Sequence, residues 1–179
     1  MSNFIYLFIF FLVGCSGEIP HNPKISDQSR FPRLSSNANG EVFLSWFEQV
    51  DSIEWSIKSS IFSQAKWSDP KEISRSSSYF INWADFPSLN FINEDTLVSH
   101  WLEKSGSGTY DYDVHLSFSF DNGKSWQSSQ IPHSTKIKGE HGFSSFGIGR
   151  NIHDFVWLDG RQMIMGHNKG GYGQMNLYH

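Results

Sequence analysis

A repeat of about 55 residues is the feature that most restricts the fold of this chain. Phe31-Pro32-Arg33-Leu34 recurs as Phe86-Pro87-Ser88-Leu89, and Leu44-Ser45-Trp46-Phe47-Glu48 recurs as Ser99-His100-Trp101-Leu102-Glu103. Both pairs are offset by 55 residues, and a third copy with Phe155-Val156-Trp157-Leu158-Asp159 follows 56 residues after the second. Because kelch-type propeller blades take about 50 residues, a period of this length predicts a propeller or a related repeat fold.

Each copy has the pattern of a meander of short strands. In the first copy, strands are predicted at Phe31–Ser35, Glu41–Glu48 and Glu54–Phe62, and Trp67 begins the connection to a last strand. The third copy ends at its third strand, within residues 174–179. No amphipathic helix is predicted beyond the N-terminal segment. We therefore expect an all-β chain that forms part of a β-propeller, with two full blades and an incomplete third, over about residues 30–82, 85–139 and 140–179.

The segment from Ser119 to Trp126 predicts a tight hairpin turn at the end of an alternating strand. Asn122-Gly123 tolerates the positive φ angles that two-residue hairpin turns require. Short acceptor side chains at Ser119 and Asp121 are suited to bind the backbone N–H groups of the turn. We expect a structural role for the fixed positions of this segment, which are Ser119, Asp121, Gly123 and Trp126.

The pattern S-x-D-x-G-x-x-W in this segment resembles the Asp box, or bacterial neuraminidase repeat, of sialidases and related β-propellers. The equivalent stretch of the first copy, Ser60–Trp67, keeps the tryptophan but has Phe62 and Gln64 in place of the aspartate and the glycine. The resemblance implies a six-bladed, sialidase-like propeller. It also implies a glycoside hydrolase of the exo-alpha-sialidase type, which acts on acidic sugars.

Further blades are then expected from a longer chain, because propellers close with about 4–8 blades and an open edge strand is prone to aggregation. Completion by a partner is the alternative. In the family, the tyrosine nucleophile, its glutamate partner and two further arginines belong to later blades. A glycosidase needs two catalytic groups that flank the bond, so we expect no hydrolysis by this chain alone.

Candidate site residues lie on one rim of the predicted propeller. In an up-and-down meander, the loops before the first strand and after the second strand of each blade share a rim, opposite the Asp-box turn. Polar and charged side chains are predicted there to contact substrate, although solvated loop ends would look the same. The residues at these positions are Arg30, Asp51, Asp85, Glu103, His141, Asp159 and Arg161.

Two of these residues gain specific roles from the resemblance. Arg30-Phe31-Pro32 resembles the R-I-P motif of sialidases, which implies that Arg30 clamps the substrate carboxylate, a task suited to a guanidinium group. In that family an aspartate in the loop after the second strand of the first blade is the general acid/base, and Asp51 lies in the matching loop. The second hypothesis is a non-catalytic propeller that binds glycan or a protein partner with the same rim.

Other kinds of site are not favoured by the sequence. The formal net charge of -4 argues against nucleic-acid binding. The histidines form no helical pair and have no cysteine partners, so we expect no zinc, and no other metal or cofactor. Asp111-Tyr112-Asp113 offers oxygen ligands for calcium, but one short acidic pair is weak support for a site.

The N-terminus predicts an exported lipoprotein. The apolar run from Phe4 to Val13 is too short to span a bilayer and has the length of a signal-peptide core. It ends in Leu12-Val13-Gly14-Cys15, which resembles a lipobox. We expect a signal peptide at residues 1–14, lipidation of Cys15, a tether over residues 15–29 and anchoring in a bacterial cell envelope. No basic residue precedes the run, and an ordinary cleaved signal is the alternative.

Overall fold

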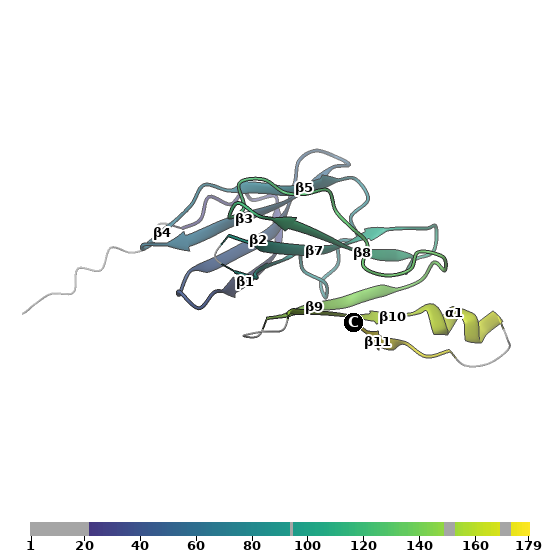
Figure 1. Ribbon diagram of the computed structural model, residues 1–179. Helices are drawn as coiled ribbons and strands as arrows, with labels where there is room; N and C mark the ends of the chain where they lie inside the picture. Colours follow the sequence, from purple (N-terminus) through teal and green to yellow (C-terminus); the bar gives the residue numbers. More distant parts are fainter. Residues whose placement is uncertain (1–21, 94, 149–152, 169–172) are drawn as a thin grey trace, which may run out of the picture.

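The computed structural model describes residues 22–93, 95–148, 153–168 and 173–179, and it shows an all-β chain with three antiparallel sheets (Figure 1). Sheet A contains β1 (Ser29–Ser36), β2 (Val42–Gln49), β3 (Trp55–Ser63), β4 (Lys66–Trp67) and β5 (Lys71–Ser76). Sheet B contains β6 (Ser88–Phe91), β7 (Leu97–Lys104) and β8 (Tyr112–Ser119). Sheet C contains β9 (His141–Ile148), β10 (His153–Asp159) and β11 (Asn176–Tyr178).

The strands expected in the first copy of the repeat are confirmed as β1, β2 and β3. The predicted turn between β1 and β2 is also present. The Asn37 side-chain oxygen accepts hydrogen bonds from the backbone N–H groups of Asn39 and Glu41, and Gly40 has a φ of +80°. Local turn chemistry therefore sets the register of the first hairpin.

The three tryptophans of the repeat occupy equivalent places. Trp46, Trp101 and Trp157 lie in the second strand of sheets A, B and C, and none is more than 5% exposed. Each indole N–H donates to the carboxylate two residues later, over 3.3, 2.8 and 3.2 Å. The acceptors are Glu48, Glu103 and Asp159. The sequence repeat is thus a structural repeat.

Sheets A and C also share a β-bulge at the start of their first strand. The pairing of β1 with β2 shifts between Arg30 and Arg33, and that of β9 with β10 shifts between Val156 and Leu158. Phe31 and Phe143 lie at these bulges with φ angles of 54° and 47°, which are uncommon for bulky side chains. A bulge inserts an extra residue and redirects the side chains that follow it.

The core lies between consecutive sheets. One buried cluster joins sheets A and B and the segment between them, and it consists of Phe43, Phe47, Ile57, Ile73, Tyr79, Leu89, Leu97 and Trp101. A second cluster joins sheets B and C and consists of Leu102, Tyr112, Val114 and Trp157. Successive residues of a strand point to opposite faces. Trp101 therefore packs toward sheet A while its neighbour Leu102 packs toward sheet C, and sheet B is covered on both faces.

The segment predicted as a two-residue hairpin is a wider loop. After β8 the chain returns at Gln127, whose N–H donates to the Phe118 carbonyl over 2.8 Å. Inside the loop, Asp121 Oδ1 accepts from the N–H groups of Lys124 and Ser125, both at 2.9 Å. The N–H of Gly123 donates to Ser119 Oγ over 2.8 Å. The expected structural bonding is present, and the turn at Asn122-Gly123 has the predicted positive φ angles of 58° and 77°. The strands on either side do not pair directly up to this turn, so the loop is wider than a two-residue hairpin.

A hairpin with only two residues between paired strand positions occurs in sheet A. Ser63 pairs with Lys66, and the two residues between them, Gln64 and Ala65, have φ angles of 50° and 61°. Positive φ at both central positions defines a type I′ turn, which matches the twist of the flanking strands. The copy that lacks the aspartate and the glycine of the Asp box thus makes the shorter turn.

One short helix, α1 (Arg161–Asn168), was not expected from the sequence. It begins directly after β10, where Asp159 Oδ1 accepts from the Arg161 backbone N–H over 3.0 Å. A carboxylate that accepts an N–H group at a helix start stabilises the first turn.

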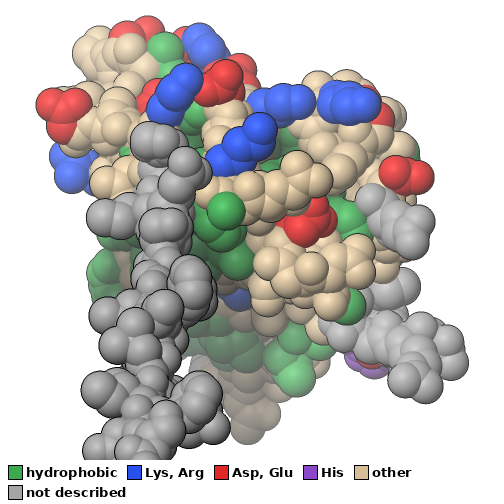
Figure 2. Space-filling view, turned by 90° about the vertical axis from the view of Figure 1, so that its left-hand side faces the viewer, with side chains coloured by type: hydrophobic (Ala, Val, Ile, Leu, Met, Phe, Trp, Pro, Cys, Tyr) green, Lys and Arg blue, Asp and Glu red, His purple; other side chains and the backbone are tan. Residues whose placement is uncertain are grey.

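The surface charges are mixed. Figure 2 shows Lys and Arg side chains next to Asp and Glu side chains over the upper part of one face, without a patch of a single sign. In the part of the chain that the structure describes, no helix is long and apolar enough to cross a membrane. Residues 1–21, which include the expected signal peptide and Cys15, lie outside the described residues.

Candidate functional site

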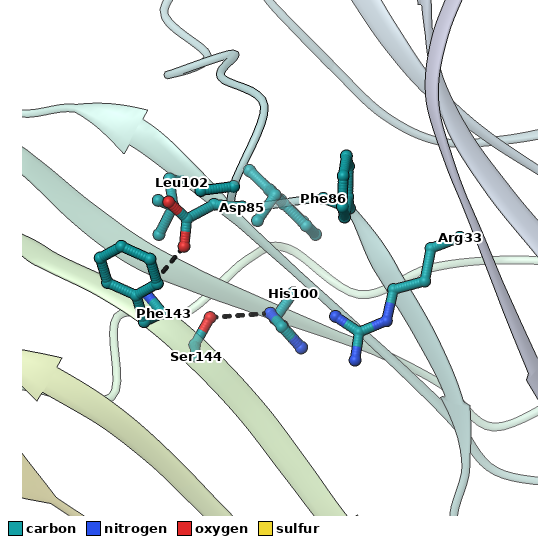
Figure 3. A pocket seen from close by; sticks show the side chains of 9 residues that line it. Arg33, Asp85, Phe86, His100, Leu102, Phe143 and Ser144 are labelled. Atoms are coloured by element: carbon teal, nitrogen blue, oxygen red, sulfur yellow. Dashed lines mark hydrogen bonds between the residues drawn. The ribbon is translucent and has the colours of Figure 1, made fainter.

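A small pocket of about 40 Å³ lies where the three sheets meet. Sheet A contributes Arg33 from β1, and sheet C contributes Phe143 and Ser144 from β9. Sheet B and the segment before it contribute Ala84, Asp85, Phe86, His100, Trp101 and Leu102. Figure 3 shows the Arg33 guanidinium pointing toward the imidazole of His100.

His100 is a buried, neutral imidazole in this pocket. Its side chain is 2% exposed, its Nδ1 lies 3.0 Å from Ser144 Oγ, and its Nε2 has no hydrogen-bond partner among the described residues. Burial, together with the nearby charge of Arg33, lowers the pKa of His100 to about 3. When the Ser144 hydroxyl donates to Nδ1, the ring proton resides on Nε2. A buried donor is then left without an acceptor, which is costly unless a ligand supplies one.

Arg33 has no ion-pair partner within the described ranges. Asp85 is the carboxylate of the pocket, and both of its oxygens accept hydrogen bonds from nearby groups of the protein. Its Oδ1 accepts the Phe143 N–H over 2.7 Å, and its Oδ2 accepts the Asn82 amide over 3.2 Å. Both of these donors are neutral, so the pocket contains one carboxylate and one guanidinium, and the guanidinium is the charged group with hydrogen-bond donors still available. A guanidinium beside an imidazole N–H is suited to bind an oxyanion such as a carboxylate.

The contact between Ser144 and His100 does not make a nucleophilic dyad. A serine nucleophile needs a base that can take its proton. An imidazole with a pKa of about 3 is too weak a base for this near neutral pH. Ser144 is better described as the residue that orients the His100 ring.

Arg30 and Asp51 do not line this pocket. Arg30 is exposed on β1, opposite Phe47 and before the bulge, whereas Arg33 after the bulge faces the pocket. Asp51 lies in the turn between β2 and β3, where its Oδ1 accepts the N–H groups of Ile53 and Glu54, both at 2.8 Å. These two bonds lower the pKa of Asp51, which opposes proton donation by a general acid near neutral pH.

Glu103 connects two sheets. It accepts the Trp101 indole N–H at 2.8 Å and the hydroxyl groups of Ser76 and Ser78 at 3.2 and 3.0 Å. Ser76 is the last residue of β5, so the carboxylate ties the end of sheet A to the end of β7. The geometry is that of a structural acceptor.

His141, Asp159 and Arg161, which were predicted on one rim, lie close together. Arg161 donates to Asp159 over 2.8 Å through Nε and contacts it at 2.7 Å through Nη2. Burial would raise the pKa of Asp159, but the hydrogen bonds from Arg161 outweigh it and hold that pKa below its usual value. Fully buried His141 has its Nε2 3.5 Å from Asp159 Oδ1. Both charges of the Asp159–Arg161 pair are thus already satisfied within the protein.

A metal-like cluster adjoins this pair. Asp113, His133 and His141 place potential ligand atoms within 4.8 Å of one another. However, the two imidazole rings are stacked, with centroids 3.9 Å apart and an interplanar angle of 6°. Ring lone pairs lie in the ring plane, so two parallel stacked rings cannot both point at one ion. His133 Nε2 also accepts the Val114 N–H over 3.1 Å. We interpret the cluster as interior packing between sheets B and C.

The acidic pair considered for calcium is divided between two environments. Asp111 Oδ2 accepts the Gly108 N–H over 2.8 Å within the loop that precedes β8. Asp113 is buried, and its Oδ1 lies 3.4 Å from His141 Nδ1. The carboxylates of Asp111 and Asp113 therefore contact different groups and do not converge on one calcium site.

Sequence reasoning missed the residues that line the pocket, apart from Asp85. Arg33 was passed over for Arg30 because a strand bulge is not visible in a short motif. His100 carried a weak signal: it precedes the repeat tryptophan, at the position that Ser45 has in the first copy. Ser144 carried none, because its partner lies 44 residues away in the chain.

Comparisons with known proteins give little further information. No protein-family model matches this sequence, and no curated protein matches it. A solved structure of an endo-1,4-beta-xylanase from Bacteroides thetaiotaomicron VPI-5482 matches with a TM-score of 0.49 and 12% identity. The match covers 76% of this chain, which spans 50% of the length of the xylanase chain. A likeness of this degree assigns neither a fold nor an activity.

Proposed function

We propose that the three sheets are consecutive blades of a six-bladed, sialidase-like β-propeller, and that the pocket binds the carboxylate of an acidic sugar. One observation carries the proposal: the unpaired Arg33 guanidinium and the unpartnered Nε2 of buried His100 face the same pocket. Support for the propeller comes from the equivalent environments of Trp46, Trp101 and Trp157.

The chemistry of the pocket favours a carboxylate. Half-buried Arg33 and buried His100 present donors to the pocket, while both oxygens of Asp85 already accept hydrogen bonds. The groups left to be satisfied are therefore donors, which favour an oxyanion. A carboxylate accepts two hydrogen bonds from a guanidinium in a planar arrangement. The small volume of about 40 Å³ suits the acidic group rather than a whole pyranose ring, which would then lie above the opening.

The described residues favour binding over hydrolysis. A glycosidase needs two catalytic groups that flank the scissile bond. Asp51 caps a turn and has a lowered pKa, and Asp85 is bonded to Phe143 and Asn82. We propose that this chain binds acidic glycan and that hydrolysis of the exo-alpha-sialidase type requires blades from a longer chain.

The test is calorimetric titration with methyl sialoside, compared with its methyl ester, which has the same shape without the charge. We expect the acid to bind and the ester to bind at least tenfold more weakly. Arg33→Ala should abolish binding of the acid, and Arg30→Ala is the matched control that should keep it. Equal binding of acid and ester, or loss of binding only in Arg30→Ala, would reject the assignment.

An assay with a fluorogenic sialoside distinguishes glycan binding alone from hydrolysis. We expect no turnover by this chain, and no change on Asp51→Asn. Measurable turnover that Asp51→Asn removes would instead establish a hydrolase that uses the expected acid.

We further propose that the chain is exported and anchored through lipidated Cys15, as its N-terminal sequence suggests. The ligand would then be an envelope or extracellular glycan. Membrane contact is proposed through the lipid alone, and no nucleic-acid partner is proposed.

A further inference from the structure

A cavity of about 190 Å³ lies between sheets B and C, next to the start of α1. Its walls come from three segments: the end of the loop before β8, the residues that lead into β9, and the first turn of α1 with the residue before it. Figure 1 shows α1 beside the point where the chain enters β9. None of the residues that the sequence predicted on the substrate rim lines this cavity.

Most of the wall is apolar. Met163 and Ile164 contribute to it from α1, and Tyr110, which is 62% exposed, contributes from the loop before β8. A Cβ atom at Gly139 would lie 3.2 Å from Ile164 Cδ1, so a side chain there would narrow the cavity. An apolar cavity of about 150 Å³ is large enough to bind benzene. This cavity can therefore hold one six-membered ring or an alkyl chain of similar size.

The charged groups of the cavity are the carboxylates of Asp111 and Glu140, and no lysine, arginine or histidine among the described residues lines it. The protein fixes one oxygen of each. Asp111 Oδ2 accepts the Gly108 N–H over 2.8 Å. Glu140 Oε1 accepts the Tyr112 hydroxyl over 2.7 Å. Neither carboxylate forms an ion pair within the ranges that the structure describes, so the second oxygen of each remains available as an acceptor.

An organic ammonium ion matches both the apolar wall and the two acceptors. Ionised carboxylates accept hydrogen bonds and donate none, so the ligand must supply donors. Hydrogen bonds between an ammonium group and a carboxylate are about twice as strong as those between neutral groups, which favours an amine over an alcohol of the same shape. An aromatic ring such as that of Tyr110 also attracts a cation. An anion would meet two like charges.

We propose that this cavity binds a small organic ammonium ion, with the ammonium group at Asp111 and Glu140 and an apolar ring or chain against Tyr110, Met163 and Ile164. The cavity shares no lining residue with the acidic-sugar pocket. The two sites also favour ligands of opposite charge. The inference is therefore independent of the proposed function.

The experiment uses benzylammonium as the probe and benzyl alcohol as its neutral match. Each is titrated at low salt and near neutral pH into the isotope-labelled full chain, and NMR follows the N–H signals of Gly139 and Gly160, which lie in the cavity wall. We expect benzylammonium to shift these signals and to bind about tenfold more tightly than benzyl alcohol. Equal binding of the two probes, or the absence of shifts at these glycines with benzylammonium, would overturn the proposal.

Two isosteric variants test the carboxylates. Asp111→Asn and Glu140→Gln each remove one charge and keep the oxygen that accepts from Gly108 or Tyr112. Each should bind benzylammonium about tenfold more weakly and leave the binding of benzyl alcohol unchanged.

Asp69→Asn is the matched control, because Asp69 is an exposed carboxylate that does not line the cavity. It should bind benzylammonium like the unmodified chain, and circular dichroism reports whether each variant keeps its fold. Unchanged binding by folded Asp111→Asn and Glu140→Gln would contradict the proposal. Equal weakening by Asp69→Asn would also contradict it, because the effect would then follow from net charge alone.

Discussion

At the scale of single residues, buried polar groups of this protein fall into two sets. Most are satisfied internally, as Asp159 is by Arg161 and by the Trp157 indole. Others have no partner among the described residues, and they include the Nε2 atoms of both His100 and His141. His100 differs from His141 in lining a pocket beside the Arg33 guanidinium, and native proteins leave few buried polar atoms without a partner. The proposed ligand would supply the missing acceptor.

The buried imidazole predicts a loss of stability in acid. In the unfolded chain His100 has the ordinary pKa of 6.5, and in the folded protein that pKa is lowered to about 3. Between these values the unfolded state binds one more proton, so the free energy of unfolding falls as the pH falls. Between pH 7 and pH 4.5, the free energy of unfolding of the unmodified chain should fall by roughly 2–3 kcal/mol more than that of His100→Gln. Urea unfolding of both proteins at both pH values measures this difference.

His133 is retained in both proteins of this comparison, and its pKa is also lowered, to about 4, by burial and the neighbouring His141. Some acid sensitivity should therefore remain in His100→Gln. Identical losses in the two proteins would show that His100 takes up its proton equally well in the folded state.

At the scale of elements, the packing of sheets onto one another stabilises the fold more than any single strand does. An isolated pair of strands is marginal in water, and each sheet here buries its apolar residues against the next one. The loop from Ser119 to Trp126 is also stabilised locally, because the Asp121 carboxylate accepts hydrogen bonds from the N–H groups of Lys124 and Ser125.

The interface between sheets B and C predicts the effect of a core truncation. Leu102 is 3% exposed in the cluster with Trp157. Leu102→Ala should lower the free energy of unfolding by about 2–5 kcal/mol, because it removes buried methyl groups and leaves a cavity. Ile53→Ala, at an exposed turn, should change it by less than about 0.5 kcal/mol. Urea unfolding followed by tryptophan fluorescence measures both, and equal effects would contradict the packing described here.

At the scale of the whole molecule, the order of the sheets along the chain matches their order in space, so that each one packs on its predecessor. This arrangement places the first strands of sheets A and C, and the segment that leads into sheet B, around one pocket.

The N-terminal sequence makes a prediction for the whole protein in a cell. Expressed in a bacterial host, the chain should incorporate labelled palmitate and sediment with membranes, because a lipid-modified cysteine binds a bilayer through its acyl chains. Cys15→Ser should incorporate no label and leave the membrane fraction. Labelling of the variant, or an unmodified chain found in the soluble fraction, would contradict lipidation at Cys15.

The sequence by itself determined the features that depend on neighbours along the chain. The period of the repeat follows from matched residues 55 apart, and the strands of the first copy follow from alternation over a few residues. The bonds of Ser119 and Asp121 also form within eight residues, so their chemistry was predictable although the width of the loop was not. The start of α1 depends on a buried carboxylate, Asp159, that sequence periodicity does not reveal.

Only the tertiary structure decided which side chains share a site. A bulge in β1 exposes Arg30 and turns Arg33 toward the pocket, and one extra residue in a strand is enough to reverse such a choice. His100 and Ser144 meet across two sheets, and the stacked pair of His133 and His141 forms only when sheets B and C pack together. Contacts between distant segments are set by how sheets bury their apolar faces, and no local pattern specifies that arrangement.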